Sequence, residues 1–132
     1  QENRKLLTYH DSWPYFAKRY GLEVIGAVQP ANFGEPTEEE ISMIVQQIRE
    51  EKVPAIFESE DFPSGVIERI ASEAGVDVVE ALRDDTLPGD ISSPEHTYVG
   101  MMVNNVSTMV TALEGDVSAL GDMDPRNTFQ AS

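Results

Sequence analysis

The chain has 132 residues, of which 40% are hydrophobic and 25% charged, proportions that are typical of one globular domain. Nine Lys and Arg residues stand against 24 Asp and Glu residues, so the formal net charge is −15. A surface this acidic repels phosphate backbones and anionic lipid headgroups, which argues against nucleic-acid binding and direct lipid binding. The chain contains no cysteine, which excludes disulfides, thiolate metal sites and cysteine nucleophiles.

Neither a membrane span nor a secretion signal is visible. No run approaches the roughly 18 consecutive apolar residues that suggest a transmembrane helix, and no basic segment precedes an apolar one as in a signal peptide. The chain opens on Gln1 rather than Met and enters a strand-like run almost at once. We therefore expect a processed or excised piece of a longer protein.

The first expected elements are a strand over 5–9 and a short helix over about 13–20. Asp11 or Ser12 can act as the N-cap of this helix. Gly21 supplies the left-handed residue that commonly follows a helix.

A second strand, over 22–28, leads to the helix with the clearest start signal in the chain. Thr37 and Glu40 form a capping-box pattern, in which each side chain accepts a hydrogen bond from the other residue's backbone N–H. The apolar residues that follow at helical spacing form the expected buried face: Ile41, Ile44, Val45 and Ile48.

The third strand is expected over 53–57, followed by a helix that Ser64 can cap and that Gly75 ends. A fourth strand over 76–79 leads into a polar loop over about 83–95.

The last expected helix carries a stripe that is typical of core packing rather than of a cofactor site. Its members are Tyr98, Met101, Met102, Asn105, Val106, Met109 and Leu113. Beyond this stripe the pattern is lost, so we expect one domain over 1–113 and a poorly ordered tail over 114–132.

Strands that alternate with helices predict the α/β class, here a small four-stranded, mostly parallel sheet with helices on both faces. In such sheets ligands bind beyond the carboxyl ends of the strands. The segments that come directly after the expected strands are therefore the places to look for a site: 9–12, 29–32, 58–61 and 80–85.

Two of these segments carry candidate metal ligands. His10 directly follows the first strand, and a neutral imidazole is a good ligand for a divalent metal. A local hydrogen bond is the more common role of such a histidine. Asp84 and Asp85 follow the fourth strand, where a carboxylate can either bind a metal or cap a turn.

The acidic residues after the third strand are expected to form a solvated loop: Glu58, Glu60 and Asp61.

The sequence gives little support for catalysis. There is no GxSxG elbow for a nucleophilic serine, and HDSW stands where a phosphate-binding glycine loop would follow the first strand.

The run LLTYHDSWPYFAKRYGLEVIGAV resembles the metal-binding solute-binding proteins of ABC importers, specifically the C-terminal lobe. In that family this lobe opens with a strand, a His-Asp-aromatic turn, a short aromatic helix that ends in Tyr-Gly, and a second strand. The resemblance continues in order through Glu35-Pro36-Thr37, Asp85-Thr86-Leu87 and the face of the last helix. Ser59 departs from it, because the family has a glutamate there.

The resemblance implies a metal ion held between two lobes, with His10 and Asp85 as the two ligands from this lobe. The N-terminal lobe, which normally supplies two further histidines, would lie outside this chain. A histidine as the first ligand of this lobe favours zinc over manganese in the family, and imidazole ligands also suit zinc chemically. The implied partner is an ABC permease, and the implied location is periplasmic or extracellular and membrane-associated.

Two other functions remain open from the residues alone. In the first, the chain is a fragment of a metal-dependent α/β hydrolase that uses His10 and Asp85. In the second, it is an interaction module that keeps the fold and has lost transport. The binding protein of an importer, without catalysis, is the leading hypothesis.

Overall fold

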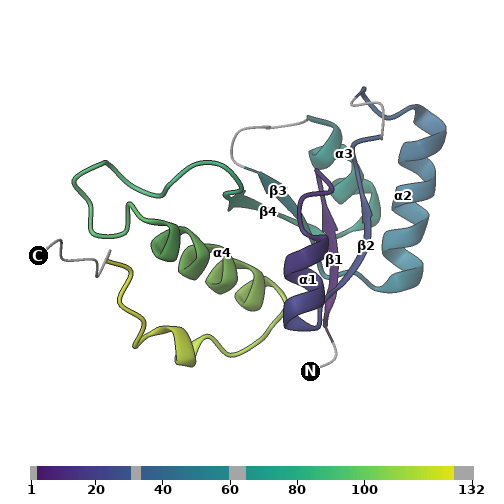
Figure 1. The fold of residues 1–132 in the computed structure, drawn as a ribbon. Helices are drawn as coiled ribbons and strands as arrows, with labels where there is room; N and C mark the ends of the chain where they lie inside the picture. The colour runs from purple at the N-terminus through teal and green to yellow at the C-terminus, as the bar shows by residue number, and fades with distance from the viewer. Residues whose placement is uncertain (1–2, 31–33, 60–64, 127–132) are drawn as a thin grey trace, which may run out of the picture.

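The computed structural model describes residues 3–30, 34–59 and 65–126 of the chain (Figure 1). Strands and helices alternate as the sequence predicts. The elements are β1 (Lys5–Thr8), α1 (Pro14–Tyr20), β2 (Glu23–Ala27), α2 (Glu38–Glu51), β3 (Ala55–Ser59), α3 (Gly65–Ala74), β4 (Asp77–Leu82), α4 (Tyr98–Ala112) and a 3-10 turn (Ser118–Leu120).

The four described strands form one sheet in the order β2-β1-β3-β4, and each neighbouring pair is parallel. This confirms the expected α/β class. Because all four strands run in one direction, their carboxyl ends share one edge of the sheet, where a ligand is expected in this class of fold.

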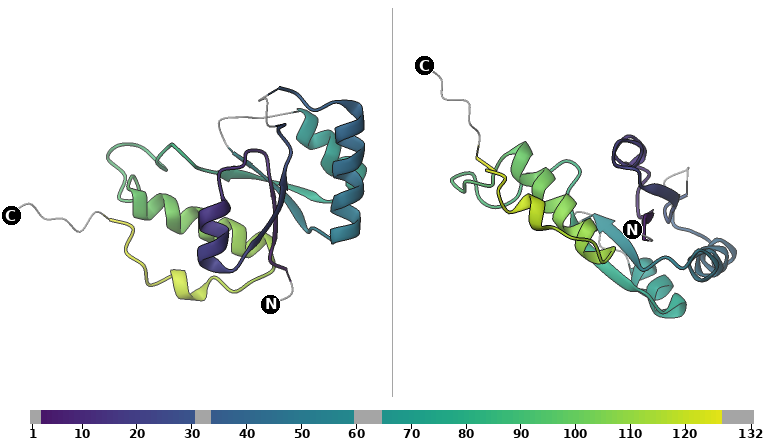
Figure 2. Two further views of the ribbon diagram at one scale, coloured as in Figure 1. Left: turned by 45° about the vertical axis from the view of Figure 1, so that its right-hand side comes forward. Right: turned by 90° about the horizontal axis from the view of Figure 1, so that it is seen from below.

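Helices cover both faces of the sheet (Figure 2). Adjacent residues of β1 point to opposite faces, so Leu7 joins one core and Leu6 the other. The core under α2 and α3 includes Ile41, Val45, Ile48, Ile56, Ile67 and Ile70. The core under α1 and α4 includes Ala17, Phe57, Leu82, Met109 and Leu113.

Helix starts and stops agree with the sequence in α2 and differ in α1. The capping box of Thr37 and Glu40 is present at the start of α2. Trp13 is the N-cap of α1 and makes no side-chain capping bond, so the expectation of Asp11 or Ser12 was wrong. Pro14 occupies the first helical position, where its missing N–H costs nothing, and the helix therefore begins without a polar cap.

All four strands differ in extent from the prediction, β1 and β2 by one residue at an end and β3 and β4 by more. β3 starts and ends two residues later than expected, and β4 continues to Leu82. The two strands pair with each other as far as Ser59 and Leu82, with a register irregularity before that pair. Strand ends depend on the pairing partner, which local sequence does not contain. The predicted cap Ser64 lies outside the described residues.

The stripe on α4 is only partly core. Met101, Asn105 and Met109 are buried, whereas Tyr98 is 67% exposed, so its expected burial was wrong. The start of α4 lies beyond the end of the sheet (Figure 1).

The described part of the segment after α4, over 114–126, runs back beside that helix (Figures 1 and 2). The hydroxyl of Thr97, the N-cap of α4, donates a hydrogen bond to the carbonyl of Pro125. The boundary at 113 stays a prediction. None of the helices in the described segments is long and apolar enough to cross a membrane.

Candidate metal site

The backbone around His10 is held from both sides by the neighbouring strands. Tyr9 donates its N–H to the carbonyl of Phe57 on β3, at 3.0 Å. On the other side Gln29 donates its N–H to the carbonyl of Tyr9, also at 3.0 Å. The hydroxyl of Thr8 donates to the carbonyl of His10 at 2.6 Å. These bonds continue the sheet one residue past the end of β1. The backbone from which the His10 side chain extends is therefore held in place.

The His10 side chain is half-buried, and two of its contacts define its orientation. Its Nδ1 lies 2.7 Å from the side-chain oxygen of Gln29. The ring of Tyr9 meets the imidazole edge-on, with 4.8 Å between the ring centroids. The ring therefore has a defined orientation at the carboxyl edge of the sheet. Gln29 lies in a segment that the sequence marked for inspection, but nothing local indicated that its amide meets His10.

The loop that carries Asp84 and Asp85 is anchored by a buried amide. Asn105, which is fully buried in α4, accepts a hydrogen bond from the backbone N–H of Arg83 at 2.9 Å. Its amide nitrogen donates to the carbonyl of the same residue at 2.6 Å. Both aspartates follow this anchor and are exposed.

His10 and Asp85 thus lie at the same edge of the sheet, after β1 and after β4. One strand, β3, separates them, and two strand spacings amount to about 9–10 Å. Both residues thus follow strands at the end of the sheet where the sequence analysis looks for a site, and their roles as ligands stay predictions.

Glu58 lies at the end of the strand between them, and its burial corrects the sequence analysis. It is 4% exposed, so it is not part of a solvated loop. The reason is that β3 extends to Ser59, so Glu58 lies within the strand rather than in the loop that follows it. The other two members of the expected acidic loop, Glu60 and Asp61, lie outside the described residues.

A surface hollow of about 420 Å³ opens between α1 and the first half of α4, beside this edge. The loop after β1 contributes Ser12 and Trp13, and the loop after β4 contributes Arg83 and Asp84. The two loops that carry the candidate ligands therefore border one depression, although neither His10 nor Asp85 lines it.

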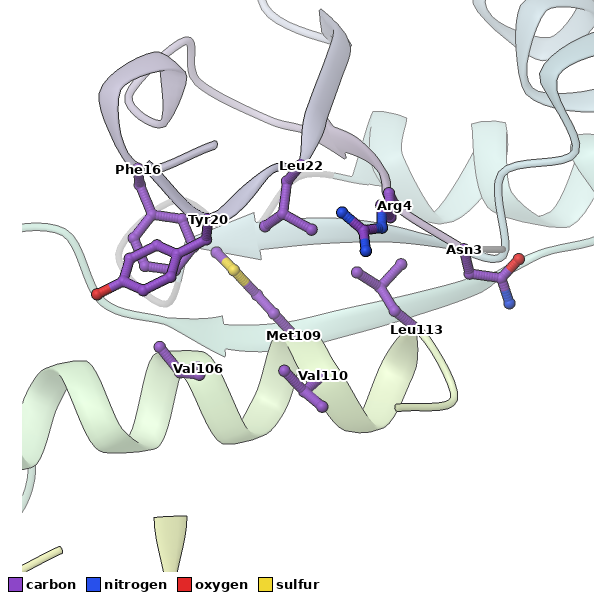
Figure 3. Close-up of a pocket in the computed structure, with 9 residues that line it drawn as sticks. All are labelled: Asn3, Arg4, Phe16, Tyr20, Leu22, Val106, Met109, Val110 and Leu113. Carbon is purple, nitrogen blue, oxygen red and sulfur yellow. The ribbon is translucent and has the colours of Figure 1, made fainter. Parts of the chain in front are cut away.

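A second hollow, of about 190 Å³, lies between α1 and the second half of α4 (Figure 3). Phe16 and Tyr20 of α1 face Met109 and Val110 of α4 across it, and Arg4 lies at its rim. Its lining is mainly apolar and it is at the amino edge of the sheet, so it is separate from the candidate metal site.

No group of three or more His, Cys, Asp or Glu side chains that could hold a metal lies within the described segments. The other histidine of the chain, His96, has its Nδ1 3.2 Å from the carbonyls of both Pro88 and Gly89. These contacts of His96 lie within the polar loop rather than at the end of the sheet that carries His10.

Residues 1–112 match the family model described as zinc-uptake complex component A, periplasmic (ZnuA). The chain belongs to this family. Its members are metal-binding solute-binding proteins of ABC importers, a family of transport components rather than enzymes. The resemblance read from the sequence is therefore confirmed.

Two curated relatives illustrate the family. The zinc-binding protein TroA of Treponema pallidum is 36% identical over 117 residues, which cover 85% of this chain and 38% of the relative. The manganese-binding lipoprotein MntA of Halalkalibacterium halodurans is 27% identical over 113 residues, which cover 86% of this chain and 37% of the relative. The chain thus spans less than half the length of the relatives that it matches.

Solved structures agree in fold. The periplasmic zinc-binding protein TroA from Treponema pallidum superposes with a TM-score of 0.71 at 34% identity, over 85% of this chain and 42% of that structure. A periplasmic metal-binding protein from Candidatus Liberibacter asiaticus gives the same TM-score at 20% identity, over 85% of this chain and 41% of that structure, and shows the fold alone. The chain corresponds to one lobe of such proteins.

Proposed function

We propose that this chain is one lobe of a solute-binding protein that carries a divalent transition metal, zinc or manganese, to an ABC permease. His10 and Asp85 supply this lobe's share of a metal site, and the other lobe supplies the rest. The metal is cargo and undergoes no reaction. The protein acts in the periplasm or outside the cell, associated with the membrane that holds the permease.

The observation that carries the proposal is the family match over 1–112, combined with the placement of His10 and Asp85 at one edge of the sheet. Relatives named as zinc-binding and as manganese-binding lipoprotein support the kind of cargo and the location. An imidazole and a carboxylate are both ordinary ligands of zinc. Zinc also forms more stable complexes than manganese with most such ligand sets, so zinc is the first metal to test.

The test is a zinc titration of the 132-residue chain, followed by calorimetry or by NMR. Two protein ligands leave water in the remaining coordination positions, so the dissociation constant should be about micromolar or weaker. His10→Ala and Asp85→Asn should each weaken binding by about tenfold or more, because each removes a ligand. Asp84→Asn is the matched control, since it removes an exposed carboxylate from the same loop.

Two results would count against this function. Equal losses in Asp84→Asn and Asp85→Asn would mean that the acidic loop attracts zinc without a specific ligand. Nanomolar binding by this chain alone would mean that the site is complete within it, and the mechanism of two lobes sharing one ion would then fail. The hydrolase alternative has no support from the comparisons, because the family consists of transport components.

A further inference from the structure

The contact between His10 and Gln29 determines which ring nitrogen of the histidine carries a proton. The Gln29 side-chain oxygen lies 2.7 Å from Nδ1, within hydrogen-bond distance. An amide oxygen only accepts hydrogen bonds. In the neutral imidazole Nδ1 must therefore carry the proton, which places the ring lone pair on Nε2.

The backbone keeps the two residues together. β1 and β2 are parallel neighbours, and the ladder between them continues past both strands. Val28 donates its N–H to the carbonyl of Thr8 at 2.9 Å, and Gln29 donates to the carbonyl of Tyr9 at 3.0 Å. The two side chains therefore emerge from adjacent, hydrogen-bonded backbone.

We propose that Gln29 is a positioning residue of the metal site, which holds His10 in the Nδ1–H tautomer so that Nε2 faces the cargo ion as the ligand atom. This inference rests on the proposed function, because it assigns the atom through which His10 binds. Metal-bound histidines generally donate their second ring N–H to an oxygen, and loss of that oxygen typically weakens metal binding 10- to 100-fold. An amide supplies the oxygen without adding a negative charge beside the imidazole.

The first measurement needs no metal. Long-range ¹H–¹⁵N spectra of the ¹⁵N-labelled chain at about pH 8, above the ordinary pKa of imidazole, distinguish the two neutral tautomers. His10 should show the Nδ1–H form in the original chain and in Gln29→Glu, whose carboxylate also accepts a hydrogen bond. In Gln29→Leu the acceptor is lost, and His10 should shift toward the Nε2–H form.

Two internal controls separate this effect from general damage. His96 makes its own contacts to backbone carbonyls in the polar loop, so its signals should be unchanged in every variant. Gln46→Leu removes an exposed glutamine of α2 whose amide bonds Glu50, and it should leave the His10 tautomer as it is. Changed His96 signals in Gln29→Leu would indicate disturbed folding, and the tautomer of the original chain, which needs no variant, would then decide the question.

The second measurement is titration with zinc alone. Gln29→Leu should weaken zinc binding about tenfold, and Gln29→Glu should retain it. An Nε2–H tautomer in the original chain would overturn the inference, as would unchanged zinc binding in Gln29→Leu. If His10 shows the expected tautomer but its signals ignore zinc, the proposed function fails while the hydrogen bond stands. The two failures are therefore distinguishable.

Discussion

At the scale of single residues, Asn105 links the last helix to the loop that carries the candidate carboxylates. Its amide makes the same pair of hydrogen bonds with the Arg83 backbone that a neighbouring strand would make. β4 is the outermost strand of the described sheet, next to β3. On the side of β4 away from β3, one side chain of α4 supplies the hydrogen bonds that a neighbouring strand would otherwise make. The direction in which Asp84 and Asp85 leave the sheet depends on this contact.

Replacing Asn105 should therefore cost stability out of proportion to its size. Asn105→Ala removes both hydrogen bonds at a fully buried position, and we expect a loss of about 2–4 kcal/mol in the free energy of unfolding. Asn104→Ala is the matched control, because its side chain is exposed on the same helix and its loss should stay within about 0.5 kcal/mol. Urea unfolding measures both. Similar losses in the two variants would show that the two hydrogen bonds between Asn105 and the Arg83 backbone contribute little to stability.

At the scale of elements, the capping box of α2 makes stability depend on pH. The Glu40 carboxylate accepts a hydrogen bond from the Thr37 backbone N–H at 2.7 Å and one from the Thr37 hydroxyl at 2.9 Å. These bonds lower the pKa of Glu40 below its usual 4.5, and the bond from the Thr37 backbone N–H has the larger effect. A lowered pKa means that the folded state favours the ionised carboxylate, so the stabilisation is complete above about pH 4.5 and is lost as the pH falls through the lowered pKa.

Glu40→Ala should consequently destabilise the chain at pH 7 and have a smaller effect in acid. Glu39→Ala changes an exposed neighbour in the same first turn, and no hydrogen bond of that side chain enters the capping box. Urea unfolding of both variants beside the original chain, at pH 7 and at about pH 3, gives the comparison. A difference between Glu39→Ala and Glu40→Ala that is the same at both pH values would contradict this account.

At the scale of the whole molecule, we expect the large negative net charge to lower folding stability. A net charge of −15 on 132 residues means that like charges repel each other across most of the surface. Salt screens that repulsion over a distance of about 10 Å at 0.1 M. The chain has two well-formed cores and should fold without a partner, but with modest stability in dilute buffer.

The melting temperature should accordingly rise as sodium chloride is added, because screening reduces the repulsion in the compact state. Zinc at matched ionic strength should add little, since a weak site at low occupancy contributes only RT ln(1 + [L]/Kd). Thermal melts with and without zinc, with His10→Ala alongside, separate the two effects. A large rise that is specific to zinc and absent in His10→Ala would show a tight site within this lobe and would rule out a shared one.

Local sequence was sufficient for most of the fold. The α/β alternation, the capping box at Thr37 and the left-handed Gly21 and Gly75, with φ of 69° and 77°, follow from propensities and spacings within a few residues. The position of His10 at a strand end was equally visible. Such features depend on neighbours in the chain, so a sequence contains them directly.

The tertiary structure alone decided which distant side chains meet. The burial of Glu58 follows from the pairing of β3 as far as Ser59, and the exposure of Tyr98 follows from where the sheet stops. The contact of Gln29 with His10 joins residues 19 positions apart, and the bonds of Asn105 reach back 22 positions to Arg83. These contacts form because parallel strands and packed helices bring separate segments together, and no local pattern records that.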